Sequence, residues 1–225
     1  MVNLFVNYYI DNNLQRQQEL ISCLSHNAAN MQIDTFYIIV ENNSIPIPKL
    51  DNEKIIKFVL SNRPSFSDYF KIANEISKDE ADINIIANSD IHFDEAGIQL
   101  MKDNLKSNEC YCLSRWDLQY GGDAIHFNRW DSFDTWVFKG KVKPIEDCNF
   151  GLGVAGCDDS IAERIQRAGY YVKNPSVDIK TYHLHLTGVR NYNPSDATPK
   201  PYLLISPHTI GEDKIIYNFI KNENT

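Results

Sequence analysis

The stretch INIIANSDIHFDEAG, Ile83 to Gly97, joins an apolar run to a group of polar and acidic residues. Its first five residues have the length and composition of a buried β-strand, and Asn88, Ser89 and Asp90 follow directly. A carboxylate that is buried without a partner costs free energy. Asp90 therefore either belongs to a site at the end of this strand or caps the following turn.

The segments around this stretch alternate strand and helix patterns. Strands are expected at residues 3–10, 34–40, 54–60 and 83–87. Helices are expected to begin at Asn12 or Asn13, at Ser67 or Asp68, and at about Asp94. This alternation predicts an α/β fold with a mostly parallel central sheet and helices on both faces. In such sheets ligands bind beyond the carboxyl ends of the strands, which is where Asn88–Asp90 are expected.

The second half of the chain is less regular. It predicts strands at residues 110–118 and 134–140, then a glycine loop that leads into a helix with Asp158, Asp159 or Ser160 near its N-terminus. Residues after about 192 are rich in proline and asparagine, and we expect a covering tail that ends in a short helix near residues 212–221.

Composition and charge exclude several classes of function. The 225 residues are 43% hydrophobic and 23% charged, and the net charge of −8 disfavours broad binding to a nucleic acid backbone or an anionic membrane. The longest apolar run, Phe36–Val40, is too short to span a bilayer, and the first residues lack the basic region of a signal peptide. Five cysteines without a C-x-x-C spacing indicate free thiols and a cytoplasmic location.

Candidate metal ligands occur in two places. Asp90 suits a hard cation such as Mg²⁺ or Mn²⁺, and His183 and His185 would face the same side of a strand in TYHLHLTG. Two imidazoles on one face suit a metal or a phosphate, although one core histidine beside an exposed one is the alternative. A zinc-dependent hydrolase that uses Asp90, His92, His183 and His185 is a competing hypothesis.

Other polar residues follow the remaining strands and loops. In GLGVAGCDDS, Asp158 or Asp159 could act as a base or bind hydroxyls, or one of them could cap the helix, and the glycine spacing matches neither a dinucleotide loop nor a P-loop. Arg63 is a candidate phosphate or ribose contact, whereas Asp68 could be a helix cap. Arg115 and Asp117 form either a strand-end site or a salt bridge. The aromatic candidates for stacking on a ligand ring, some of which must be core residues, are Trp116, Tyr120, Trp130 and Trp136.

Together these segments resemble a small, nucleotide-sugar-dependent glycosyltransferase of the GT-A fold, in a bacterial and phage subgroup. NSDI resembles the acidic D-x-D metal motif in a form that keeps only the last acid, and RPSFSDYFKIAN resembles the nucleotide-side segment upstream of it. DTWVF, FGLGVAGCDDSIAERI and NPSVDIKTYHLHLTGVRNY resemble the acceptor-side half. The resemblance covers about residues 3 to 192 and is strongest from Trp136 onward.

The resemblance implies a single domain over residues 1–225, with a nucleotide-sugar half at about 1–110, an acceptor and catalytic half at about 111–192 and a tail at 193–225. It implies a divalent metal, Mn²⁺ or Mg²⁺, on Asp90 with His183 or His185, and Asp158 or Asp159 as the base on the acceptor. The implied donor, a UDP-sugar, would contact Arg63, Asp68, Asn88, Ser89, Asp90 and Arg115. The implied acceptor would contact Trp116, Asp117, Trp136 and Gly156.

The acceptor and the strength of metal binding stay open at this point. Asn88 stands where many relatives have aspartate, which predicts weaker metal binding or dependence on the nucleotide. A glycan, a lipid-linked sugar or a small molecule fits the net charge better than a modified DNA base, although the KGKVKP segment at residues 139–144 carries three lysines. A fold that only binds a nucleotide or glycan is the non-enzymatic alternative.

Overall fold

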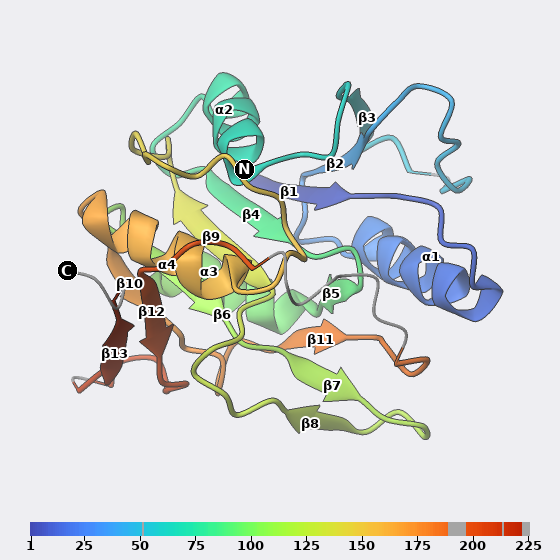
Figure 1. Ribbon diagram of the computed structural model, residues 1–225. Helices are drawn as coiled ribbons and strands as arrows, with labels where there is room; N and C mark the ends of the chain where they lie inside the picture. The colour runs from blue at the N-terminus through green and yellow to red at the C-terminus, as the bar shows by residue number, and fades with distance from the viewer. Residues whose placement is uncertain (51, 189–196, 213, 222–225) are drawn as a thin grey trace.

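A computed structural model describes residues 1–50, 52–188, 197–212 and 214–221. Its centre is a seven-stranded sheet in the order β10-β6-β9-β4-β1-β2-β3 (Figure 1). The strands are β1 Val2–Asn7, β2 Thr35–Val40, β3 Ile55–Val59, β4 Ile83–Ala87, β6 Glu109–Leu113, β9 Thr135–Lys139 and β10 Tyr171–Lys173. Neighbouring strands run parallel except at β9, which is antiparallel to both β4 and β6. The expected mostly parallel α/β sheet is confirmed.

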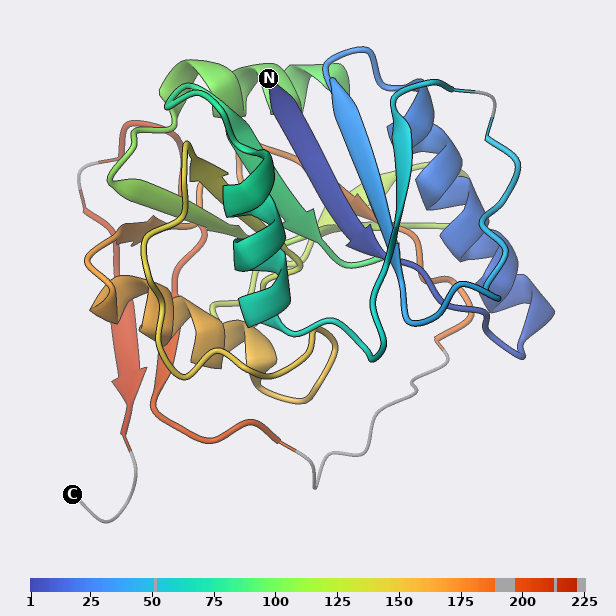
Figure 2. The ribbon, with the colours of Figure 1, turned by 90° about the horizontal axis from the view of Figure 1, so that it is seen from above.

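Helices cover both faces of this sheet, as Figure 2 shows. α1 Leu14–Ala29 and α3 Glu95–Asn104 lie on one face, and α2 Phe66–Ile76 and α4 Cys157–Arg167 lie on the other. Alternate side chains of each strand point to opposite faces, and both sets are apolar. Burial on both faces explains why the strand sequences read as continuous hydrophobic runs.

A second, four-stranded sheet in the order β5-β11-β7-β8 lies beside the carboxyl edge of the first. Its strands are β5 Ile91–Phe93, β7 Trp116–Leu118, β8 Ala124–His126 and β11 Thr181–His183. The single strand expected at residues 110–118 is therefore wrong, because β6 and β7 belong to different sheets. The chain leaves β6 at Ser114, whose backbone N–H donates to the Asn174 side chain (3.0 Å) instead of to a neighbouring strand.

The described end of the chain forms a hairpin of β12 Tyr202–Ile205 and β13 Tyr217–Ile220. β12 packs on α4 through the buried Leu203 and Ile205, so this part of the predicted tail does cover the domain. The short helix expected near residues 212–221 is wrong. Ile215, Ile216 and three of the four residues of β13 are β-branched or aromatic, and β13 pairs with β12 over its whole length. Residues 193–196 of the predicted tail lie outside the described part.

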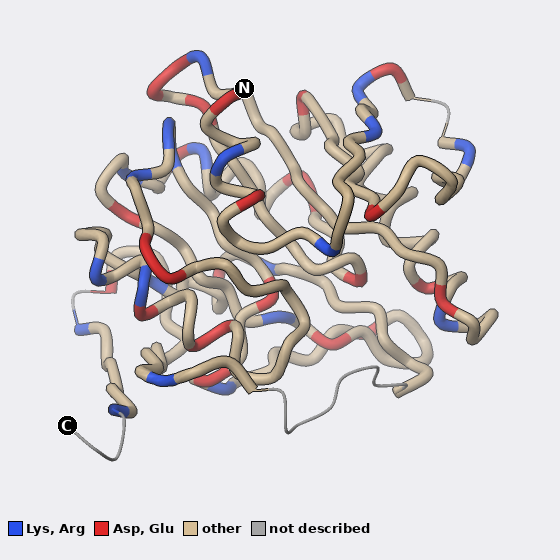
Figure 3. Tube along the Cα trace, turned by 45° about the horizontal axis from the view of Figure 1, so that its top comes forward, with Lys and Arg blue, Asp and Glu red and all other residues tan. Residues whose placement is uncertain are grey.

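Charged residues of both signs are distributed over the fold (Figure 3), and the cysteines are free, as the sequence predicts. Lysine and arginine are interspersed with aspartate and glutamate along the trace in Figure 3. All five cysteines are buried and none forms a disulfide. Within the described residues, no helix combines the length and the apolar character needed to cross a bilayer.

Candidate active site

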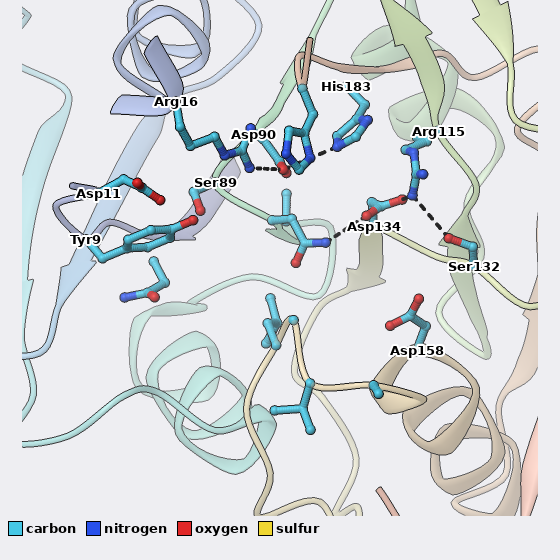
Figure 4. Close-up of a pocket in the computed structure, with 18 of the residues that line it drawn as sticks. Tyr9, Asp11, Arg16, Ser89, Asp90, Arg115, Ser132, Asp134, Asp158 and His183 are labelled. Carbon is cyan, nitrogen blue, oxygen red and sulfur yellow. Dashed lines mark hydrogen bonds and ion pairs between the residues drawn. The ribbon is translucent and has the colours of Figure 1, made fainter. Parts of the chain in front are cut away.

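A cavity of about 770 Å³ opens at the carboxyl edge of the central sheet (Figure 4). Because β9 runs against its neighbours, its first residues meet the last residues of β4 and β6 at this edge. Polar residues that follow β1, β4 and β6 and that precede β9 therefore line the cavity. They include Tyr9, Asp11, Asn88, Ser89, Asp90, Arg115, Ser132 and Asp134.

Asp90 is buried at one side of the cavity and accepts two charged hydrogen bonds. Its Oδ2 atom accepts from Arg16 Nη2 at 2.5 Å and from His183 Nε2 at 3.2 Å. Burial acts to raise the pKa of Asp90, but the charges and hydrogen bonds of His183 and Arg16 outweigh it and hold this pKa far below its usual range. Asp90 is therefore a permanent anion at the end of β4.

His183 lies between two carboxylates. Its Nδ1 atom is 2.7 Å from Asp117 Oδ1, and its Nε2 atom faces Asp90. Burial acts to lower the pKa of His183, but Asp90 and Asp117 outweigh burial and raise it to about 9. Asp117 in turn accepts from Arg115 Nε at 2.8 Å. This chain fixes the orientation of the His183 ring.

Asp90, His183 and His185 form a group with metal-ligand chemistry. Each offers one ligand atom, and these atoms all lie within 4.8 Å of one another. The Oδ1 atom of Asp90 is buried and has no hydrogen-bond partner among the described residues. A buried carboxylate oxygen without a partner is costly, and a cation would satisfy it. The residues present therefore fit a divalent metal.

Asn88 has a local reason to be an amide rather than a carboxylate. Its Nδ2 atom donates to Asp134 Oδ1 at 2.7 Å, and Asp134 Oδ2 accepts from Arg115 Nη1 at 3.0 Å. An aspartate at position 88 would face the Asp134 carboxylate and would repel it. Asn88 and Arg115 thus hold the Asp134 carboxylate in place at the cavity.

Asp158 lines the cavity on the side away from Asp90, at the start of α4 (Figure 4). Its Oδ2 atom accepts from the Phe133 backbone N–H at 3.3 Å, and its Oδ1 atom accepts from Cys157 Sγ at 2.9 Å. Burial and, after it, the nearby charge of Asp134 raise the pKa of Asp158 to about 7. A carboxyl with a pKa near neutrality is suited to general base catalysis.

Asp159 differs from its neighbour in position. It is buried, it does not line the cavity, and burial and the charge of Asp158 raise its pKa to about 8. Neither acid caps α4, because the helix is capped by Gly156, which has a left-handed backbone with φ of 70° and makes no side-chain cap bond. Of the two acids, Asp158 is the one that lines the cavity.

The glycine loop reaches the cavity together with Arg63. Arg63 Nη2 donates to the Leu152 carbonyl at 2.5 Å, and Leu152 and Gly153 line the cavity beside it. A Cβ atom at Gly153 would lie 3.1 Å from Arg63 Nη2. The φ of Gly153 is 71°, in the left-handed region, so the backbone conformation favours glycine here and the Arg63 contact leaves little room for a larger residue.

The structure corrects several sequence expectations. Asp68 does not line the cavity and forms a capping box with Ser65 at the start of α2, which is the helix-cap alternative. Trp136 is fully buried in the core and cannot contact an acceptor. The predicted sugar-stacking residues Trp116, Tyr120 and Trp130 do not line the cavity, and Asp117 reaches it only through His183 and Arg115.

The four-ligand zinc site is also not formed. The His92 ring stacks between His26 and Tyr182, with ring centroids 4.6 Å and 5.3 Å away. In the antiparallel pair β5 and β11, His92 is opposite Tyr182, whereas His183 is opposite Ile91. Because successive residues of a strand face opposite sides, His92 and His183 point away from each other.

Sequence reasoning missed Arg16, Glu19 and Asp134. Arg16 and Glu19 lie on the buried side of α1 with Leu20, Cys23 and Leu24. A charged pair on the apolar face of an amphipathic helix is a signal that could have been read from the sequence. Asp134 had no such signal, because its role depends on the reversed direction of β9.

The arrangement of the sheet and its helices is a glycosyltransferase-like fold. No family model and no curated protein sequence matches the chain. Among solved structures, it is similar to the mannosyltransferase PcManGT from Pyrobaculum calidifontis in complex with GDP-Man and Mn²⁺, with a TM-score of 0.52, 12% identity, and 84% of this chain and 58% of that chain covered. It is also similar to S. aureus TarS 1-349 in complex with UDP-GlcNAc, with a TM-score of 0.55, 10% identity, and 89% and 62% covered. The chain thus spans about six-tenths of each of these solved chains.

Proposed function

We propose that this protein transfers a sugar, a hexose in the simplest case, from a nucleotide-sugar donor to a hydroxyl acceptor. The observation that carries the proposal is a single cavity with a metal-ligand group on one side and a carboxyl of near-neutral pKa on the other. The likeness in fold to two chains solved with GDP-Man and UDP-GlcNAc supports the same activity.

The donor would lie over the ends of β1 and β4. Five of the proposed donor contacts line the cavity, namely Arg63, Asn88, Ser89, Asp90 and Arg115. Arginine suits a diphosphate because its guanidinium offers several fixed N–H donors. A UDP-sugar is the first donor to test.

A divalent cation would be held by Asp90, His183 and His185, and when bound it would neutralise the negative charge of the departing nucleoside diphosphate. Two imidazoles and one carboxylate suit Mn²⁺ better than Mg²⁺, which prefers oxygen ligands and keeps its waters. Asp117 supports this group by accepting a hydrogen bond from the far nitrogen of His183.

Asp158 is the proposed general base. It would take the proton of the acceptor hydroxyl while the acceptor oxygen bonds to the anomeric carbon and the bond from that carbon to the diphosphate oxygen breaks. The backbone N–H of Phe133 and the thiol of Cys157 hold its carboxylate in place. Because Asp158 and the metal-ligand group lie on different sides of the cavity, a direct displacement with inversion is the expected stereochemistry.

A glycan, a lipid-linked sugar or a small molecule is the proposed acceptor class, in preference to DNA. The three lysines of the KGKVKP segment do not border the cavity. In the pairing of β4 with β9, Lys139 is opposite Ile83 at the start of β4, whereas the cavity lies at the end of β4. A DNA acceptor at the cavity would therefore not contact these lysines, and the net charge of −8 disfavours binding to its phosphate backbone.

The test measures nucleotide release from UDP-, GDP- and TDP-sugars with Mn²⁺, with Mg²⁺ and with a chelator. We expect slow donor hydrolysis that needs the metal, that is lost in Asp90→Ala and His185→Ala, and that persists in Asp103→Asn, a matched control on the surface of α3. Donor binding without release in any condition would favour a binding protein. Neither binding nor release with any donor would overturn the proposal.

A further inference from the structure

A buried ion-pair network joins α1 to the segment that follows β11. Arg16 Nη1 donates to Glu19 Oε2 at 3.0 Å and to the Leu184 carbonyl at 3.1 Å, while its Nη2 atom donates to Asp90. Glu19 then accepts from the Thr187 backbone N–H at 2.9 Å and from the Thr187 hydroxyl at 3.0 Å. Arg16 and Glu19 are 5% and 6% exposed.

This network holds Asp90 in one orientation. Both Arg16 and His183 approach Oδ2, so the carboxylate cannot rotate without breaking a charged hydrogen bond. The same arrangement leaves Oδ1, which is buried, without a partner among the described residues. Arg16 therefore fixes the orientation of the Asp90 carboxylate within the metal-ligand group.

The network also fixes the segment that carries His185. Leu184 precedes this histidine and bonds to Arg16, while Thr187 follows it and bonds twice to Glu19. His185 lies two residues beyond the end of β11. The contacts of Leu184 and Thr187 to α1 therefore fix the backbone on both sides of it.

Stability alone does not explain such a network. Buried ion pairs are commonly no more stabilising than apolar residues of the same volume, which would suit the apolar side of α1. A positioning role does explain it, because a metal needs its ligands held at fixed positions, and the partners behind the ligands orient them.

We propose that Arg16 and Glu19 are positioning residues for the metal site. Arg16 orients the Asp90 carboxylate, and Glu19 acts through Thr187 to fix the segment that carries His185. This inference rests on the metal site of the proposed function and adds to it a support from α1 that lies outside the ligand group.

The experiment measures Mn²⁺ binding to the full chain without any donor, from the electron paramagnetic resonance signal of free Mn²⁺. We expect Arg16→Gln to bind Mn²⁺ about 10- to 100-fold more weakly than the parent protein. The direction of the change in Mn²⁺ affinity distinguishes a positioning role from the alternatives. Removing a positive charge beside Asp90 would strengthen cation binding if charge alone mattered, and a purely structural role would leave the affinity unchanged.

A second pair of variants protects the test against misfolding. Thr187→Val removes the hydroxyl bond to Glu19 at nearly constant volume, whereas Thr187→Ser keeps the hydroxyl. We expect weaker Mn²⁺ binding in the valine variant and parent-like binding in the serine variant, with thermal melting measured for each. If Arg16→Gln does not fold, this pair decides the question. Arg167→Gln, an arginine that is half exposed on α4, is the control for loss of an arginine.

The outcomes separate this inference from the proposed function. Parent-like Mn²⁺ affinity in folded Arg16→Gln and Thr187→Val would overturn the inference and leave the glycosyltransferase proposal intact. Metal binding that weakens as expected, in a protein that releases nucleotide from no donor, would support the inference and overturn the proposed function. A parent protein that binds no Mn²⁺ would overturn the inference and the metal assignment together.

Discussion

The proposed role of Asp158 predicts a specific pH dependence. A base must be deprotonated to accept a proton, and the pKa of Asp158 is raised to about 7 by burial and then by Asp134. The value of kcat/KM should therefore fall to about a tenth of its plateau at pH 6 and to about a hundredth at pH 5. An ordinary aspartate would keep nearly the full rate at pH 5.

Two substitutions identify the group that titrates. Asp158→Asn should lower the transfer rate by about 10²- to 10⁴-fold. The residual activity of this variant should no longer fall between pH 7 and pH 5, so the acid limb of the pH profile should be absent. Asp134→Asn removes only the second cause of the raised pKa, so the limb should move to lower pH without disappearing. A shift of about one unit would leave about half of the plateau at pH 6. The comparison with the parent uses the shape of the pH profile and not the absolute rate, because Asp134 also accepts hydrogen bonds from Asn88 and Arg115.

The assay follows transfer at saturating Mn²⁺ from pH 5 to pH 9, with nucleotide release as the readout. Unfolding measurements on each variant serve as the control for misfolding. The folded-state pKa of Asp158 lies above the unfolded value of 3.8, so the folded state holds the proton more tightly and stability falls as pH rises from about 4 to about 7. Asp158→Asn avoids this loss and should be more stable than the parent at pH 7.5, by about 1 to 3 kcal/mol.

Refutation is straightforward. An acid limb that stays at the same pH in Asp134→Asn would show that the nearby charge does not set the titration. An unchanged limb and rate in a folded Asp158→Asn protein would remove Asp158 from the mechanism and return attention to Asp159.

Further predictions concern the loop, the core and the metal. Gly156→Ala should destabilise the protein by about 1 to 3 kcal/mol in urea unfolding, because its φ is 70° and a Cβ would lie 2.9 Å from the Tyr202 hydroxyl. Gly122→Ala, at φ of 95° with no atom within 4 Å, should cost less. Trp136→Phe should lower the melting temperature and leave the acceptor KM unchanged. A chelator should abolish donor hydrolysis, Mn²⁺ should restore it better than Mg²⁺, and His92→Ala should not alter the restoration.

The sequence predicts the fold well where one short segment determines one element. The strand at 83–87, the Asn13 cap of α1 and the helix after Asp94 all depend on local patterns, and each is confirmed. The predictions fail where contacts between residues far apart in the sequence determine the secondary structure. β13 is a strand because β12 pairs with it, and residues 110–118 divide because Ser114 turns away to Asn174.

The candidate site follows the same division. Residues at the ends of strands could be found from the sequence, since the chemistry of the fold gathers them at one edge. Trp136 could not be assigned, because an indole in a strand can face the core or the solvent with the same neighbours. Arg16 acts across 74 positions of the chain, and no local pattern connects it to Asp90.

The reversed direction of β9 has an evolutionary consequence. The chain leaves the sheet after Leu113 and returns at Asp134, and the backbone N–H of Asp134 donates to the Leu113 carbonyl at 3.0 Å. This hydrogen bond holds the first and last residues of the excursion next to each other. At its tip, a Cβ atom at Gly121 or Gly122 would meet no atom of the described residues within 4 Å. Lineages could lengthen or exchange this tip while Arg115 and Asp134 stay anchored.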